Sequence, residues 1–131
     1  MQKLKQEIIH SNIDQLPLGT LIIEPETTPK AIVQISHDIM EYKERHVMFA
    51  EFLAHHNYLV VIHDHRGHGQ SAKEYEDLSH FYVKQKDSLI KDLHQITTWI
   101  KQKYPNLPLY MLGAGFGAIT AKLYLKNMIM N

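Results

Sequence analysis

Cysteine is absent from the 131-residue sequence, which excludes disulfide bonds and thiolate metal sites. The absence is compatible with a reducing compartment, and we expect a cytoplasmic protein. No stretch approaches the roughly 18 consecutive apolar residues of a membrane-spanning helix. The first residues also lack the apolar centre of a signal peptide. We therefore predict neither a membrane span nor a secretory leader.

An excess of charge of either sign is also lacking, since 14 basic side chains are balanced by 14 acidic ones. Nucleic-acid-binding domains typically carry a basic excess, so we predict no nucleic-acid partner. Hydrophobic residues make up 44% of the sequence and charged residues 21%, which is typical of a folded domain. The length suits one domain over residues 1–131, although α/β enzyme domains often reach roughly 200–250 residues.

Short apolar runs bounded by turn residues predict five strands, at residues 6–11, 19–25, 30–36, 58–64 and 108–112. A short loop joins the first two runs, which favours a hairpin. The fourth run, YLVVIHD, is apolar without alternation, as expected for a strand that is covered on both faces.

Helical spacing of apolar residues predicts helices over residues 44–57, 79–104 and 116–130. Asn57 suits a left-handed helix cap, and Pro105 disfavours helical backbone in the residue before it. Alternating strands and helices predict an α/β fold with three α/β/α layers and a mostly parallel, doubly wound sheet. In such a fold, ligands bind at the carboxyl ends of the strands.

The loop GAGFGA after the fifth strand matches two patterns. Gly113, Gly115 and Ala118 fit a dinucleotide-binding fingerprint, in which glycines let a pyrophosphate approach a helix N-terminus. Gly113 and Gly117 also fit the outer glycines of a nucleophile elbow, with Gly115 in the place of the serine. A dinucleotide site normally lies in the first βαβ unit, with an acidic residue about 20 positions later. The elbow is favoured, and we predict no cofactor.

The loop HDHRGH after the fourth strand offers a metal-dependent hydrolase as an alternative. His63, His65 and His68 approximate a zinc-binding H-x-H-x-D-H pattern, but Gly67 stands where that pattern needs an aspartate. We favour an interpretation in which Asp64 and Arg66 brace the loop by an ion pair. No metal site is predicted.

Three motifs in this order resemble the α/β-hydrolase family, and within it the branch of monoacylglycerol lipases, lysophospholipases and serine aminopeptidases. The first family motif follows the third strand and is matched by His37, Glu41, Arg45 and His46, while Asp38 replaces a glycine. The second motif, D-x-R-G-H-G-x-S, is matched at all of its fixed positions, namely Asp64, Arg66, Gly67, His68, Gly69 and Ser71. The third is the elbow itself. The resemblance thus implies the N-terminal half of an α/β-hydrolase fold.

The resemblance implies a serine hydrolase of acyl esters or of N-terminal peptide bonds, but Gly115 has no oxygen with which to attack a carbonyl. The elbow backbone is normally strained, and a glycine relaxes it. The oxyanion-hole donors would be the N–H groups of Ile39 and Phe116, beside which Asp38 places an opposing charge. The family's acid and histidine lie further downstream than this sequence extends.

We therefore expect a catalytically inactive member of the family. The alternative is a non-catalytic module that binds an acyl ligand or a protein. Neither Ser71 nor the weaker candidate Ser36 is predicted to replace the nucleophile. Because the fifth strand would form an uncovered sheet edge, we also expect a dimer or a second polypeptide there.

Overall fold

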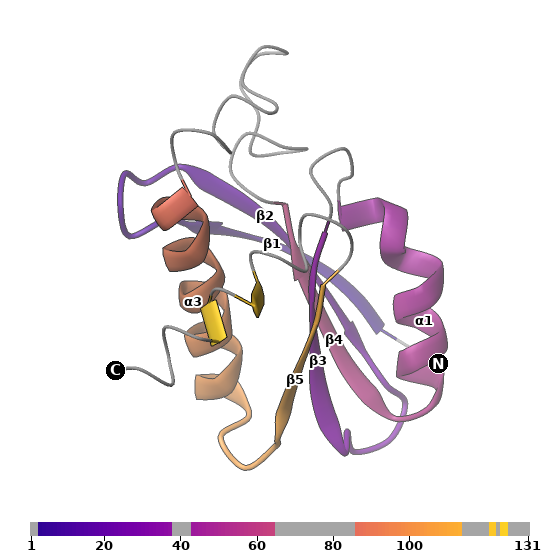
Figure 1. Cartoon of the computed structure of the whole chain (residues 1–131). Coiled ribbons are helices and arrows are strands. Elements are labelled where there is room, and N and C mark those ends of the chain that lie inside the picture. Colours follow the sequence, from indigo (N-terminus) through magenta and orange to yellow (C-terminus); the bar gives the residue numbers. More distant parts are fainter. Residues whose placement is uncertain (1–2, 38–42, 65–85, 114–120, 123, 126–131) are drawn as a thin grey trace.

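The computed structural model describes residues 3–37, 43–64, 86–113, 121–122 and 124–125 (Figure 1). One five-stranded sheet forms the centre, with the strand order β1-β2-β4-β3-β5. The strands are β1 (Lys3–His10), β2 (Pro17–Glu24), β3 (Ala31–Ser36), β4 (Tyr58–His63) and β5 (Leu109–Gly113). All five predicted strands are therefore present.

The sheet is mixed, because β2 runs antiparallel to both of its neighbours, β1 and β4. The predicted hairpin of the first two strands is confirmed by this β1–β2 pairing. The parallel part consists of β4, β3 and β5. The neighbouring strands β4, β3 and β5 bring their carboxyl ends side by side to one edge of the sheet, so the predicted chemistry belongs there.

Helices cover both faces of the sheet, which confirms the three-layer arrangement. The 3-10 helix η1 (Lys43–His46) and the helix α1 (Val47–His55) lie on one face, and α3 (Lys86–Lys103) lies on the other (Figure 1). The predicted helix 79–104 thus corresponds to α3 from residue 86 onward, and residues 79–85 lie outside the described part. Of the third predicted helix, residues 121–122 and 124–125 are described and helical.

Two apolar clusters form the core, one on each face of the sheet. Val60 and Ile62 of β4 pack with Ala50 and Ala54 of α1 on the first face. On the second face, Leu59 and Val61 pack with residues of α3. Successive β4 residues therefore alternate between two covered faces, which is why this strand shows no polar alternation in its sequence.

Polar contacts fix α3 against the turn that follows β1. The buried hydroxyl of Ser11 donates to the carboxylate of Asp92 at 2.6 Å. The Gln95 side chain accepts from the backbone N–H of Asn12 and donates to the carbonyl of His10, each at 2.8 Å. Because hydrogen bonds are directional, these bonds fix both the position of α3 along the sheet and its distance from the sheet.

Asn57 ends the α1 segment in the left-handed conformation, with φ of 71°, as the sequence predicts. Its side chain also accepts a hydrogen bond from the Thr27 hydroxyl at 2.6 Å. We expect Asn57→Ala to lower the free energy of unfolding by about 1–2 kcal/mol, because a Cβ is strained at this φ and the Thr27 bond is lost. Asn57→Gly should cost less, since it loses only the bond. Chemical denaturation of the two variants checks this ranking, and equal losses would contradict it.

None of the described helices is long and apolar enough to cross a membrane.

Candidate active site

The carboxyl ends of the three parallel strands place the sequence-predicted residues at one edge of the sheet. Ile35 of β3 pairs with Ile62 of β4, and Ser36 pairs with Gly113 of β5. His37 follows β3 and Asp64 follows β4. The two residues therefore lie side by side at the same end of their strands. Gly113, the first glycine of the elbow pattern, ends β5 at that level as well.

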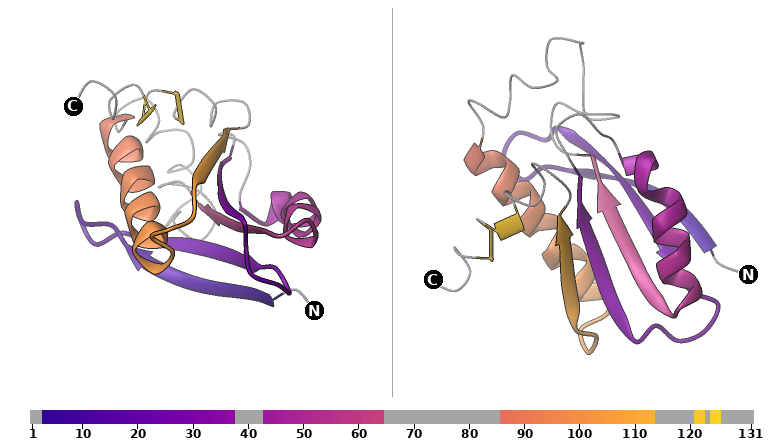
Figure 2. Two further views of the ribbon diagram at one scale, coloured as in Figure 1. Left: turned by 90° about the horizontal axis from the view of Figure 1, so that it is seen from below. Right: turned by 45° about the vertical axis from the view of Figure 1, so that its right-hand side comes forward.

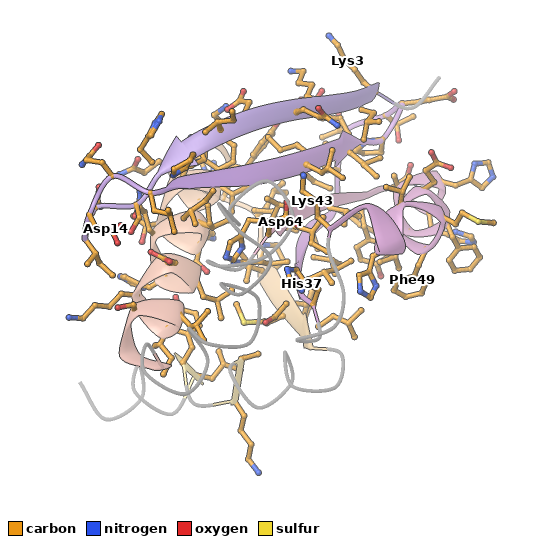
Figure 3. All side chains as sticks on the ribbon, turned by 90° about the horizontal axis from the view of Figure 1, so that it is seen from above. Lys3, Asp14, His37, Lys43, Phe49 and Asp64 are labelled. Atoms are coloured by element: carbon orange, nitrogen blue, oxygen red, sulfur yellow. The ribbon has the colours of Figure 1, made fainter. Side chains whose placement is uncertain are left out.

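A fully buried ion pair lies at this edge. The Lys43 ammonium contacts Asp64 Oδ2 at 2.9 Å, and both side chains have no exposed surface. The backbone N–H of Lys43 also donates to Asp64 Oδ1, at 2.8 Å. Both carboxylate oxygens thus accept a hydrogen bond from the same residue, which ties η1 to the end of β4 (Figure 3).

Asp64 is held from two further directions. Its backbone N–H donates to the carbonyl of Gly19 in β2 at 2.9 Å. His37 Nε2 lies 4.0 Å from Asp64 Oδ1, and this imidazole is also fully buried. Asp64 therefore links β2, β3, β4 and η1, and its carboxylate serves chiefly to hold these elements together.

His63 precedes Asp64. Because successive residues of a strand point to opposite faces, the His63 side chain lies on the face of the sheet opposite that of the Asp64 side chain. It is completely buried. Loss of hydration lowers the pKa of His63 to about 3, with a smaller contribution from His37, while Asp64 acts in the other direction. His63 is therefore neutral near pH 7.

The metal alternative involves His63, His65 and His68, of which only His63 is described. Among the residues that the structure describes, no three His, Asp or Glu side chains are grouped so as to hold a metal ion. Since His65 and His68 lie outside the described residues, the metal alternative stays a prediction.

Most of the predicted site residues lie outside the described residues. They are Asp38, Ile39, Glu41, Arg66, Gly67, His68, Gly69, Ser71, Gly115, Phe116 and Gly117. Their roles stay predictions, as does the ion pair of Asp64 with Arg66. Ser36, the weaker candidate nucleophile, is described and is fully buried at the end of β3.

Lys43 is the residue that sequence reasoning missed. It stands in the charged run YKERH, which is typical of a solvated helix start, and its partner follows 21 residues later. One signal pointed to it indirectly: Asp64 follows an uninterrupted apolar strand, and a carboxylate buried there needs a cation.

Comparisons with known proteins identify the family and the fold of this chain. Residues 27–129 match the family model of the serine aminopeptidase S33 family. Human monoglyceride lipase is 36% identical over 100 residues, which cover 76% of this chain and 31% of the lipase. A monoglyceride lipase homolog of monkeypox virus is 37% identical over 95 residues, covering 72% of this chain and 33% of that protein. The chain thus spans about a third of the length of these relatives.

Among solved structures, a thermostable carboxyl esterase from Bacillus coagulans superimposes with a TM-score of 0.83 at 24% identity. The match covers 92% of this chain and 39% of the esterase, and it supports the fold alone. The family model covers most of the chain and includes every strand that brings its carboxyl end to the candidate site. The chain therefore belongs to the serine aminopeptidase S33 family and adopts an α/β-hydrolase fold.

Proposed function

We propose that this chain binds an acyl ester of the monoacylglycerol type without hydrolysing it. The observation that carries the proposal is Gly115, which stands at the nucleophile position of the elbow pattern within the family match. Hydrolysis through an acyl-enzyme needs an oxygen or sulfur at this position, and glycine supplies neither.

The described residues at the carboxyl end of β4 support this proposal. Asp64 already binds the Lys43 ammonium at 2.9 Å, and its carboxylate has no exposed surface. His63 is completely buried, with its pKa lowered to about 3. A general base must reach the proton that it removes and must accept it near the working pH. Neither residue meets both conditions.

The ligand class is proposed from the relatives, two of which are a monoglyceride lipase and a monoglyceride lipase homolog. A single acyl chain on a small polar head is the feature that such a ligand must provide. Peptides are the second class, because the family model is that of a serine aminopeptidase.

Covalent labelling with a fluorophosphonate probe tests the missing nucleophile. We expect no adduct on the purified chain, whereas a monoglyceride lipase labelled in parallel as a positive control should react completely. In a companion experiment, the chain incubated with a monoacylglycerol should retain it, and the recovered ligand should be intact.

Labelling that is saturable and maps to a serine would contradict the inactive assignment and identify the substitute nucleophile. Ser71 and Ser36 are the positions to inspect first in peptide mass spectra. Failure to retain the monoacylglycerol, combined with an absence of labelling, would instead contradict the ligand class alone.

A protein-interaction role is the second candidate, and it is supported by β5, which is an outer strand among the strands that the structure describes. Tyr110 and Leu112 of this strand expose 60% and 40% of their surfaces. Exposed apolar side chains on an edge strand are a typical site for strand pairing with another polypeptide.

A further inference from the structure

A network of polar side chains connects the centre of the sheet with α3. It begins at Gln34, which is buried in β3. The Gln34 amide donates from Nε2 to the carbonyl of Leu93 at 3.3 Å, and its Oε1 accepts from the hydroxyl of Thr97. These two partners fix the orientation of the amide, because the reverse orientation would place the Gln34 oxygen against the Leu93 oxygen.

The network continues into the helical segment that follows the elbow pattern in the sequence. Tyr124 of this segment is buried and forms a hydrogen bond with the Thr97 side chain. The Tyr124 hydroxyl also lies 2.9 Å from His94 Nδ1 of α3, and the two ring centroids are 5.5 Å apart. Figure 2 shows the segment with residues 121–122 and 124–125, in yellow, beside α3 in both views. Tyr124 therefore joins this segment to α3 and, through Thr97, to β3.

The Thr97 hydroxyl has a single proton to donate. Its acceptors are Gln34 Oε1 and the Leu93 carbonyl, which lies 3.0 Å away. Neither of these oxygens can donate a proton in return. The Thr97 proton is therefore used between α3 and β3, and Thr97 can only accept from Tyr124.

The Tyr124 hydroxyl likewise has one proton. Burial raises the pKa of Tyr124 more than the hydrogen bond with Thr97 lowers it, so the phenol is neutral near pH 7. Its proton goes to Thr97, which leaves only lone pairs of the Tyr124 oxygen for the contact with His94. This contact at 2.9 Å is then a hydrogen bond in which His94 donates from Nδ1.

We propose that Tyr124 is a positioning residue, which fixes the helical segment after the elbow pattern by donating to Thr97 and accepting from His94 Nδ1. This direction of donation also places the proton of His94 on Nδ1 and the lone pair on Nε2. A single hydroxyl makes both hydrogen bonds, so its loss removes both contacts at once. The proposal concerns the framework that holds the candidate site, and it depends neither on Gly115 nor on an acyl ligand.

Nitrogen-15 NMR of the histidine side chains in the purified chain tests the direction of donation. At about pH 8.5, where histidine is normally neutral, His94 should carry its proton on Nδ1 in wild type. Thr97→Val removes the acceptor of Tyr124, so the tyrosine should then donate to His94 and move the histidine proton to Nε2. Thr97→Ser should restore the wild-type spectrum. His56 is the internal control, because its Nδ1 lies 2.9 Å from the carbonyl of Phe52 and should stay protonated in every variant.

Amide hydrogen exchange of the variant Tyr124→Phe tests the positioning role. The substitution keeps the aromatic ring and removes the hydroxyl. Exchange at residues 124 and 125 should therefore accelerate by roughly three- to tenfold, whereas exchange in α1 should not change.

A wild-type spectrum with the His94 proton on Nε2 would overturn the proposal, as would a His94 tautomer that Thr97→Val leaves unchanged. Unaltered exchange at residues 124 and 125 in Tyr124→Phe would overturn the positioning role. If Thr97→Val fails to fold, the wild-type spectrum and Tyr124→Phe still decide the outcome. None of these results depends on fluorophosphonate labelling, so the two proposals fail separately.

Discussion

Replacing Lys43 with methionine should lower the free energy of unfolding by about 3–5 kcal/mol, because it leaves the Asp64 carboxylate buried without its cation. Methionine has a similar length, so the substitution removes the charge without creating a large cavity. The backbone N–H of residue 43 still reaches Asp64 Oδ1, which is 2.8 Å away in wild type. The loss therefore reports on the ammonium at 2.9 Å from Oδ2. Urea denaturation monitored by circular dichroism measures it.

Two control variants test whether the loss of stability comes from the buried charge. Lys5→Met removes the ammonium of a pair with the same 2.9 Å separation, but the two side chains of this pair are 42% and 25% exposed, so water screens the interaction and we expect a much smaller loss. The double variant Lys43→Met/Asp64→Asn should cost less than the sum of its two single variants, because no unpaired charge stays buried. Equal losses for Lys43→Met and Lys5→Met would contradict the role of the buried pair.

The stability of the protein should decrease as the pH falls below about 6.5, and His63 should account for part of the decrease. Burial lowers the pKa of His63 to about 3 in the folded protein. The unfolded chain therefore binds a proton at this histidine before the folded protein does. Its contribution is present above the unfolded pKa and is lost between about pH 6.5 and 3.

Between pH 6.5 and 5 the loss attributable to His63 should reach roughly 2 kcal/mol. The variant His63→Gln has no titrating group at this position, so its free energy of unfolding should fall less steeply over the same interval. Comparing the two slopes avoids any dependence on the absolute stability of the variant. Parallel slopes for wild type and His63→Gln would contradict the assignment.

Apolar patterning was sufficient to predict the five strands and their three-layer packing, because burial on two faces leaves a direct mark on the sequence. It was less informative at the sheet edge. The strand β1 extends over Lys3–His10, whereas the sequence predicts residues 6–11, because one face of this strand is exposed and its first residues alternate with charges. Pairing with β2 sets its true start.

The candidate site was only partly predictable for a physical reason. His37, Asp64 and Gly113 follow apolar strands, and their place at one edge follows from parallel pairing. Lys43 contacts Asp64, which lies 21 residues later in the sequence. Because lysine is charged, its sequence position alone predicts an exposed side chain. Local sequence patterns do not reveal a contact between residues that lie so far apart in the sequence. The same limit applied to Ser11 and Asp92, which lie 81 residues apart.

We propose that Gly115 leaves the α/β-hydrolase framework of this chain without the atom that attacks an ester. The most direct measurement is the initial rate of monoacylglycerol hydrolysis by the purified chain over a range of substrate concentrations. We expect a rate that does not exceed that of the buffer and does not saturate. Saturable turnover that a serine-hydrolase inhibitor abolishes would contradict the account.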